Sequence, residues 1–185
     1  MTQYRLLDAD FLINLVRTLS IIQKYDSSTA GKIEQICDEC RYSLISTNFV
    51  KTEVSNKINL KNPKDRDKFF EPRKKEALKI QKDIFKKVRI IDLSRNPFMS
   101  IYKGTRSKNL GEKSLVVLLT SKYSGQVNSG GDSVKIVSNN TSDVLSYLYE
   151  MKRANSKLSF LDASSLIMPN YEFYYDLFTQ LVVRF

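Results

Sequence analysis

The sequence predicts an α/β protein whose central parallel sheet is covered by helices on both faces, a three-layer α/β/α arrangement. Short apolar runs of four to six residues alternate with longer segments in which apolar side chains recur every three or four residues. This alternation is typical of βαβ units, in which buried parallel strands read as continuous apolar runs. The chain has 185 residues, a length that suits a single domain, and we expect one domain over residues 1–185.

The expected elements follow the chain in order. An apolar strand at 4–9 is followed by a helix at 10–25, where six apolar side chains share one face. Further helices are expected at 30–41, 48–58, 73–87, 110–123, 141–153 and 171–183, and further strands at 43–46, 88–93, 134–138 and 158–161. Stretches containing Pro or Gly at 59–72, 94–109 and 125–133 are expected to form loops or connectors.

The composition excludes several kinds of catalytic site. The chain contains no histidine, which removes Ser-His-Asp and Cys-His nucleophiles, histidine-ligated zinc and imidazole acid–base catalysis. Its two cysteines, Cys37 and Cys40, form one pair, whereas structural zinc needs a second pair of ligands. The apolar runs fall well short of the ~20 residues that cross a bilayer. We therefore expect a cytoplasmic protein with no membrane partner.

Acidic and amide side chains gather where the predicted strands end. Residues of this kind come from four separate elements: Asp8 and Asp10, Glu53, Glu112, and Asn139, Asn140 and Asp143. Ligands of parallel α/β sheets bind at the carboxyl ends of the strands, so we expect these side chains to meet at one edge. Two charges about 4 Å apart repel by roughly 4 kcal/mol at an effective dielectric of about 20, and a divalent cation relieves that repulsion. Oxygen ligands of this type favour Mg²⁺ or Mn²⁺.

The same residues resemble the motifs of a known nuclease family. The run LLDADFLINL resembles the opening strand and helix of a PIN-domain nuclease, and LISTNFVKTEV resembles its second motif. The stretch LGEKSLVVLL is similar to the Gly-Glu helix start of many members, and VKIVSNNTSDV to the final motif. The motifs occur in the family's order and cover about residues 4–150. The chain departs from the family at Asn140, where many members carry Asp, and Asn139 is an alternative match.

The resemblance implies a metal-dependent endoribonuclease of the VapC-like or a related PIN type, acting as a toxin or in RNA processing. Asp8, Glu53, Glu112 and Asp143 would form the catalytic and metal site for one or two Mg²⁺ or Mn²⁺ ions, with Asn140 as a further ligand. Ser138 and Asp10 would help orient the substrate. Relative to compact members, the extra length would be a basic helical insertion at about 59–87 and an irregular one at about 94–109.

Positive charge is concentrated in one segment. Residues 57–89 contain 13 Lys and Arg against five acids, a net charge of +8 in a chain whose total is +10. Surfaces of this kind attract nucleic-acid phosphates through counterion release. We expect Arg73, Lys74, Lys75 and Lys79 to bind an RNA substrate, single-stranded or structured. A solvated helix face is the alternative interpretation. Phe69, Phe70 and Phe85 would either stack on bases or pack inward.

Other interpretations of the same residues stay open. Asp10 fits a helix N-cap, Asn140 with Asp143 fits a capping box, and Glu53 and Glu112 fit ordinary helix positions. Asp8-Ala9-Asp10 also resembles the motif of haloacid-dehalogenase-like phosphatases, although Leu12 stands where that family expects Thr or Val.

A non-catalytic PIN-like module that binds RNA or a protein is a third hypothesis, and Asn140 favours it. An antitoxin, another protein or a second copy of the chain are the protein partners that we consider. The aromatic residues of the last helix are expected to pack mainly in the core.

Overall fold

The strands of the described residues form one sheet in which every neighbouring pair is parallel, as the sequence predicts. They are β1 (Gln3–Leu7), β2 (Tyr42–Thr47), β3 (Arg89–Ile91), β4 (Val134–Val137) and β5 (Ile167–Met168), in the spatial order β3-β2-β1-β4-β5. This computed structural model describes residues 2–25, 40–59, 68–99, 109–127 and 133–182, with positions 28, 31 and 35.

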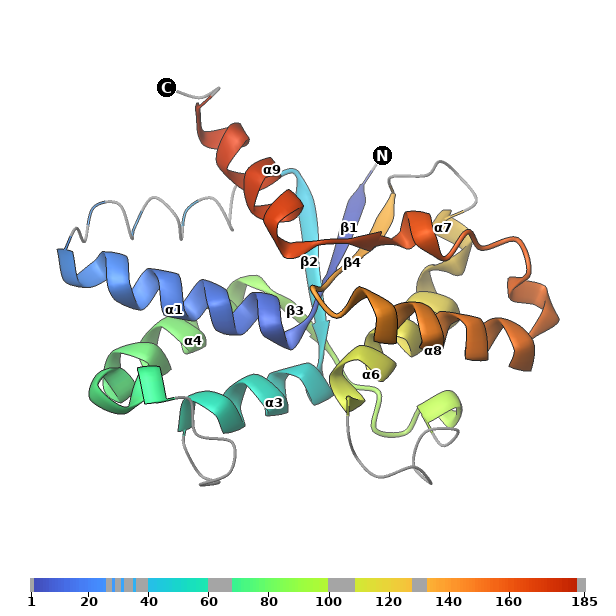
Figure 1. Cartoon of the computed structure of the whole chain (residues 1–185), viewed down its shortest axis with the longest axis horizontal. Helices are drawn as coiled ribbons and strands as arrows, with labels where there is room; N and C mark the ends of the chain where they lie inside the picture. The colour runs from blue at the N-terminus through green and yellow to red at the C-terminus, as the bar shows by residue number, and fades with distance from the viewer. Residues whose placement is uncertain are drawn as a thin grey trace.

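Helices cover both faces of the sheet, which confirms the three-layer prediction (Figure 1). The α-helices are α1 (Ala9–Tyr25), α3 (Asn48–Asn59), α4 (Lys74–Lys87), α6 (Leu110–Leu118), α7 (Ser124–Val127), α8 (Thr141–Ala154) and α9 (Asn170–Val182). Helices α1, α3 and α4 pack together on one side, and α6 packs on α8 on the other. Right-handed crossovers explain why the helices divide between the two faces. The chain runs from β1 to β2 and β3 in one direction along the sheet and then returns past β1 to β4 in the other, so the connecting helices lie on opposite faces.

The core is built from the strands and the inward faces of these helices. Leu6, Ile45 and Ile136 are fully buried in the three central strands, as expected for a parallel sheet covered on both sides. Helix α3 buries Val50 and Val54, one turn apart, with no exposed surface. Burial of a side chain of this size contributes roughly 1.5–3 kcal/mol, so the apolar stripes hold each helix at a defined place on the sheet.

Two predicted element types are wrong. The predicted strand at 158–161 is a 3-10 turn, η5 (Ser156–Leu158), and the last strand is β5. The Asn155 side chain accepts a hydrogen bond from the Lys157 backbone N–H at 3.1 Å, and this local bond favours a turn. The predicted loop at 59–72 contains the start of another 3-10 helix, η2 (Lys68–Arg73).

Several predicted boundaries shift without changing the element order. The helix expected at 110–123 consists of α6 and a π-helical segment, η4 (Leu119–Tyr123), and continues through α7 into the expected connector. Between β3 and α6 the described residues include one short 3-10 turn, η3 (Pro97–Met99), and η6 (Ser164–Leu166) precedes β5. Of the helix expected at 30–41, positions 31 and 35 are helical, 40 and 41 form a bend, and Cys37 lies outside the described residues.

Hydroxyl groups join the end of β2 to the helix layers. The Thr47 hydroxyl lies 2.6 Å from the Ser114 hydroxyl on α6 and accepts the Val50 backbone N–H of α3 at 3.2 Å. Ser46 donates to the Leu7 carbonyl at 2.7 Å. Both β2 side chains are fully buried, so these bonds satisfy polar groups that water does not reach. They hold the starts of α3 and α6 against the carboxyl edge of the sheet.

We predict that Thr47→Val lowers the free energy of unfolding by about 1–3 kcal/mol. The change keeps the side-chain shape but removes the α3 cap and leaves the Ser114 hydroxyl with one partner fewer. Chemical denaturation of both proteins measures the difference. Thr18→Val on α1 is the matched control, because no described hydrogen bond involves that hydroxyl. Equal stability of the two variants would contradict the assigned role of Thr47.

Candidate functional site

Asp8 occupies the centre of the carboxyl edge of the sheet. The strand order reverses between β1 and β4, which makes this the topological switch point where α/β sheets bind ligands. Asp8 follows β1 directly and is only 2% exposed. Its carboxylate accepts the Ser138 hydroxyl, which follows β4, at 2.6 Å and the Ala9 backbone N–H at 2.7 Å. Burial, and then the negative charges of Glu112 and Asp10, raise the pKa of Asp8 well above its ordinary value.

An amide network joins the acids of α6 and α8. The Asn140 side-chain NH₂ donates to Glu112 at 3.0 Å and to Asp143 at 2.9 Å. Asn109, the residue before α6, donates to the same Asp143 oxygen at 2.7 Å. Asn109 has a left-handed backbone, with φ of 60°, a conformation that Asn tolerates better than most residues. The amides thus supply donors between carboxylates that would otherwise face one another.

Glu53 reaches the same edge from α3. A Cβ atom built on Gly111 would lie 2.7 Å from the Glu53 Oε2 atom and 3.6 Å from the Asp8 Oδ1 atom. Both carboxylates therefore approach the first turn of α6 at Gly111, where the absence of a side chain leaves room for them. The structure brings Asp8, Glu53, Glu112 and Asp143 to one region, together with Asn140 and Ser138.

Asp10 is not the N-cap of α1, and its side chain bonds to other elements. Helix α1 begins at Ala9, so Asp8 occupies the position before the helix and Asp10 lies in its first turn. One Asp10 oxygen accepts the Asn139 backbone N–H at 2.9 Å and the Asn170 side-chain amide at 3.1 Å. Asp10 thus joins α1 to the β4–α8 loop and to the start of α9, which gives it a positioning role.

The capping-box interpretation of Asn140 and Asp143 is also wrong. Asn140 precedes α8 but makes no side-chain cap, and its backbone N–H donates to Ser138 at 3.0 Å. Asp143 instead accepts the amides of Asn140 and Asn109. The polar side chains at the start of α8 therefore turn toward the site.

The predicted RNA-binding basic residues lie on a different part of the molecule. Lys74, Lys75 and Lys79 are exposed on α4, which packs on α1 and α3, and no described interaction joins them to the acids. Arg73 lies over the Phe69 ring, with 5.0 Å between the guanidinium carbon and the ring centroid, and Arg17 of α1 lies 5.4 Å from the same centroid. Arg17 is seven residues beyond Asp10, roughly 10 Å along α1 at 1.5 Å per residue.

The aromatic residues of the basic segment pack inward. Phe70 is fully buried, and Phe69 and Phe85 are half-buried against the core. In the last helix Phe173 is fully buried and its ring lies tilted against Phe11, whereas Tyr171 and Tyr175 are more than 70% exposed. The expectation of core packing is thus confirmed for Phe173 and wrong for the two tyrosines. The side chain of Phe178 lies outside the described residues.

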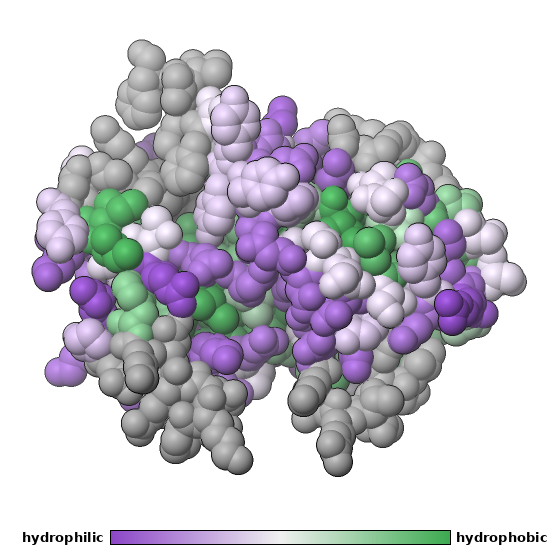
Figure 2. Space-filling view, in the orientation of Figure 1, coloured by the Kyte–Doolittle hydropathy of each residue, from purple (hydrophilic) through white to green (hydrophobic). Residues whose placement is uncertain are grey.

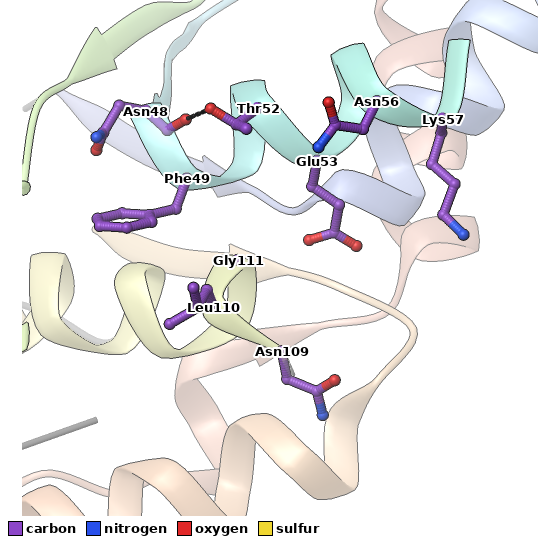
Figure 3. A pocket seen from close by; sticks show the side chains of 9 residues that line it. All are labelled: Asn48, Phe49, Thr52, Glu53, Asn56, Lys57, Asn109, Leu110 and Gly111. Atoms are coloured by element: carbon purple, nitrogen blue, oxygen red, sulfur yellow. Dashed lines mark hydrogen bonds between the residues drawn. The ribbon is translucent and has the colours of Figure 1, made fainter. Parts of the chain in front are cut away.

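A pocket of about 450 Å³ adjoins the acids between α3 and the start of α6. Its lining includes Glu53 and Gly111, together with Phe49, Lys57 and Asn109. Figure 3 shows Glu53 and Lys57 pointing from α3 toward Asn109 and the first turn of α6. In Figure 2 hydrophilic residues gather over the centre of the face of the molecule that Figure 1 presents. The acids thus lie beside a pocket of mixed polar and apolar lining that can admit a ligand.

Sequence reasoning missed several residues of the site. Asn109 and Asn170 are distant in sequence from the acids that they bond, so no local motif identifies them. Lys113 is only 7% exposed and lies 5.1 Å from the ring centroid of Tyr147 on α8. The sequence could have identified Lys113 by its position next to Glu112 in an otherwise apolar helix, because a lysine is seldom buried unless it is paired with another group.

The oxygens of the site have the chemistry that a divalent cation requires. The Glu112 Oε2 atom is buried and has no hydrogen-bond partner in the described part of the chain. Such an atom normally has a partner, and a cation would supply one while offsetting the charge of Asp8. As the side chains stand, the described residues contain no group of three acids or cysteines arranged to hold a metal ion. The Asn140 amide lies between two of these acids instead.

Comparison with family models, with curated proteins and with solved structures gives no match for this chain. In the described residues no helix is both long enough and apolar enough to span a bilayer.

We predict that Asp8→Asn stabilises the fold at neutral pH in metal-free buffer. An acid whose pKa is raised on folding loses stability as the pH rises from its unfolded pKa of about 3.9 through its folded pKa. Asparagine removes that loss, so we expect its melting temperature to exceed that of the wild type by about 2–4 °C or more at pH 7. The difference should vanish as the pH falls toward about 4.

Scanning calorimetry between pH 4 and 8 in EDTA measures this difference. Asp162→Asn is the matched control, because that carboxylate is exposed and its pKa is lowered by hydrogen bonds from Ser164. A lower melting temperature for Asp8→Asn at pH 7 would show that the Asp8 charge stabilises the fold.

Proposed function

We propose that this protein is a metal-dependent nuclease of the PIN type that hydrolyses RNA phosphodiester bonds. The observation that supports it best is the approach of Asp8 and Glu53 to Gly111 at the switch point of the sheet, with Glu112 close enough to raise the pKa of Asp8 and a buried Glu112 oxygen that has no described partner. A cluster of this kind is costly without a cation, and Mg²⁺ or Mn²⁺ suits its hard oxygen ligands. The adjoining pocket gives a substrate access to these groups.

Each residue has a defined part in this proposal. Asp8, Glu53 and Glu112 would hold one or two ions, and Asp143 and Asn140 would complete the site. Ser138 holds the Asp8 carboxylate through its hydroxyl, and Asp10 holds the neighbouring loop through Asn139. A bound ion lowers the pKa of its water and screens charge on the phosphate oxygens.

The chain's own contribution is to keep the acid oxygens fixed before substrate arrives. The carboxyl ends of the strands set the backbone positions, and the buried hydroxyl of Ser138 and the amide of Asn140 orient the carboxylates. Groups held in place in this way need no rearrangement at the moment of reaction, which is the main advantage of a preorganised site. Toxin and RNA-processing roles both agree with this chemistry.

A non-catalytic module that binds RNA or a protein is the second candidate. It is favoured by the Asn140 amide, which donates to Glu112 and Asp143 and so satisfies part of their charge without a cation. A metal titration separates the two candidates. Retention of RNA binding with no change in melting temperature at millimolar Mn²⁺ would favour the module.

The phosphatase alternative gives no part to Glu53 or Glu112, although both lie near Asp8. It requires Asp8 as a nucleophile toward a phosphate ester. Turnover of an aryl phosphate with a phosphorylated Asp8 detected by mass spectrometry would support it over the nuclease.

We predict that Asp8→Asn and Glu112→Gln each reduce Mn²⁺-dependent cleavage of single-stranded RNA by at least about 100-fold. Mn²⁺ should also raise the melting temperature of the wild type, by the equivalent of about 2.7 kcal/mol at 100 times its Kd, and should do so less in the variants. Asp162→Asn is the control for both measurements. Undiminished cleavage by Asp8→Asn would overturn the proposal.

We predict that Gly111→Ala impairs cleavage without destabilising the fold. Its φ is not positive, so alanine suits the helix and the melting temperature should be equal or higher. The added Cβ would lie 2.7 Å from Glu53 Oε2, so the carboxylate must move. A displacement of about 1 Å at such a site can cost roughly 100-fold in rate.

Gly125→Ala is the matched control, because its Cβ would meet nothing within 4 Å. Rates and melting temperatures of both variants are measured under the same Mn²⁺ conditions. Full activity of Gly111→Ala would exclude a role for the Glu53 position in the reaction.

A further inference from the structure

One face of α3 is directed at the pocket beside the acids. Phe49, Thr52, Glu53, Asn56 and Lys57 follow one another at the spacing i, i+3, i+4, i+7 and i+8, so they form a single stripe, and all of them line the pocket. The stripe is roughly 12 Å long at 1.5 Å per residue. The fully buried Val50, Val54 and Ile58 occupy the inward face of the helix.

The polar side chains of this stripe differ in whether they make hydrogen bonds within the protein. Thr52 donates to the Asn48 carbonyl at 2.8 Å, and the Asn48 amide bonds Ser94 and the Leu93 backbone. By contrast, the side chains of Asn56 and Lys57 make no hydrogen bond or ion pair with other described residues. These two side chains are therefore available to a ligand in the pocket.

The pocket combines an aromatic wall, a cation and a neutral amide. Phe49 is half-buried at the end of the stripe near the start of α3, and Lys57 lies two turns further along (Figure 3). The volume of about 450 Å³ lies within the range of small-molecule and cofactor pockets, roughly 300–1,000 Å³. An aromatic ring, an amide and a lysine are the groups that bind a base, its polar edge and a phosphate.

We propose that this pocket binds one nucleotide of a single-stranded RNA, next to the phosphodiester that the acids cleave. The inference rests on the proposed function and adds a substrate subsite to it. Lys57 contacts a backbone phosphate, Phe49 stacks on or packs against the base, and Asn56 contacts the base edge. Glu53 lies between Phe49 and Lys57 on the stripe, so the nucleotide is held beside one of the proposed metal ligands. The pocket, rather than the basic face of α4, then determines which RNA bond is cut.

The test measures nucleotide binding and cleavage separately. Binding of the four nucleoside 5′-monophosphates to the full-length protein is followed by isothermal titration calorimetry with Mg²⁺. Lys57→Gln should weaken binding of all four by about five- to tenfold. Lys51→Gln is the matched control, because Lys51 is exposed on the same helix and lies over Phe85 of α4 instead. It should change the affinity less than twofold.

Two further variants test the base contacts. Asn56→Ala should alter the order of affinity among the four bases, and Asn56 is exposed, so its loss leaves the fold intact. Phe49→Leu should weaken binding of every base, with the melting temperature measured to verify folding. In RNA cleavage these changes should raise KM and alter the cut positions while kcat changes less than twofold.

The outcomes distinguish the subsite from the nuclease itself. If Lys57→Gln and Lys51→Gln weaken nucleotide binding equally, the binding comes from the overall positive charge, and the subsite proposal is overturned. Cleavage that depends on Asp8 but is indifferent to Phe49, Asn56 and Lys57 would also overturn it and leave the nuclease standing. Nucleotide binding that depends on Lys57 without any cleavage would support the subsite and reject the nuclease. A pocket that binds a peptide but no nucleotide at millimolar concentration would overturn the subsite as well.

Discussion

The burial of Asp8 at the switch point of the sheet is the constraint on which the rest of the site depends. A parallel sheet directs the ends of β1, β2 and β4 to one edge, and the helices of both layers begin there. Asp8 therefore lies in a dry environment with other acids nearby, which raises its pKa. A buried carboxylate is stabilised by hydrogen bonds from the protein or by a bound cation. The chain supplies hydrogen bonds to Asp8 from the Ser138 hydroxyl and the Ala9 backbone N–H.

The described hydrogen bonds to these acids come from neutral donors rather than from basic side chains. Ser138 bonds Asp8, and the amides of Asn140 and Asn109 bond Glu112 and Asp143. Neutral donors orient carboxylates without cancelling their charge, so the negative charge that a cation would offset remains. The same donors explain why two candidate functions remain in competition, since an amide can satisfy a carboxylate in a protein that never binds metal.

The distribution of positive charge gives the molecule two different basic regions. The face of α4 carries many lysines that are exposed to solvent, and under the proposed function it would attract an RNA without regard to sequence. Lys57 instead lines the pocket beside Glu53, at the end of a stripe that begins with Phe49. In the proposal, long-range attraction and local recognition would fall to different helices, although both sets of lysines belong to the segment in which the sequence concentrates its charge.

The sequence by itself determined the fold class, the order of nearly all elements and the acids at the strand ends. These features depend on local patterns: apolar runs for buried strands, three- to four-residue spacing for helices, and Asp or Asn directly after a strand. Short segments are decided by local bonds instead, and the predicted strand at 158–161 is a turn because the Asn155 side chain accepts a hydrogen bond from the Lys157 backbone.

The tertiary structure alone decided which residues surround the acids. Asn170 bonds Asp10 across 160 positions, Thr47 meets Ser114 across 67, and Asn109 meets Asp143 across 34. None of these pairs has a local signature, because a hydrogen bond between distant residues depends on the packing of whole elements. The same holds for Lys57, which the sequence places in the basic segment and which only the packing of α3 against the start of α6 brings to the pocket. Spacing along a chain predicts the faces of a helix, but packing decides what each face meets.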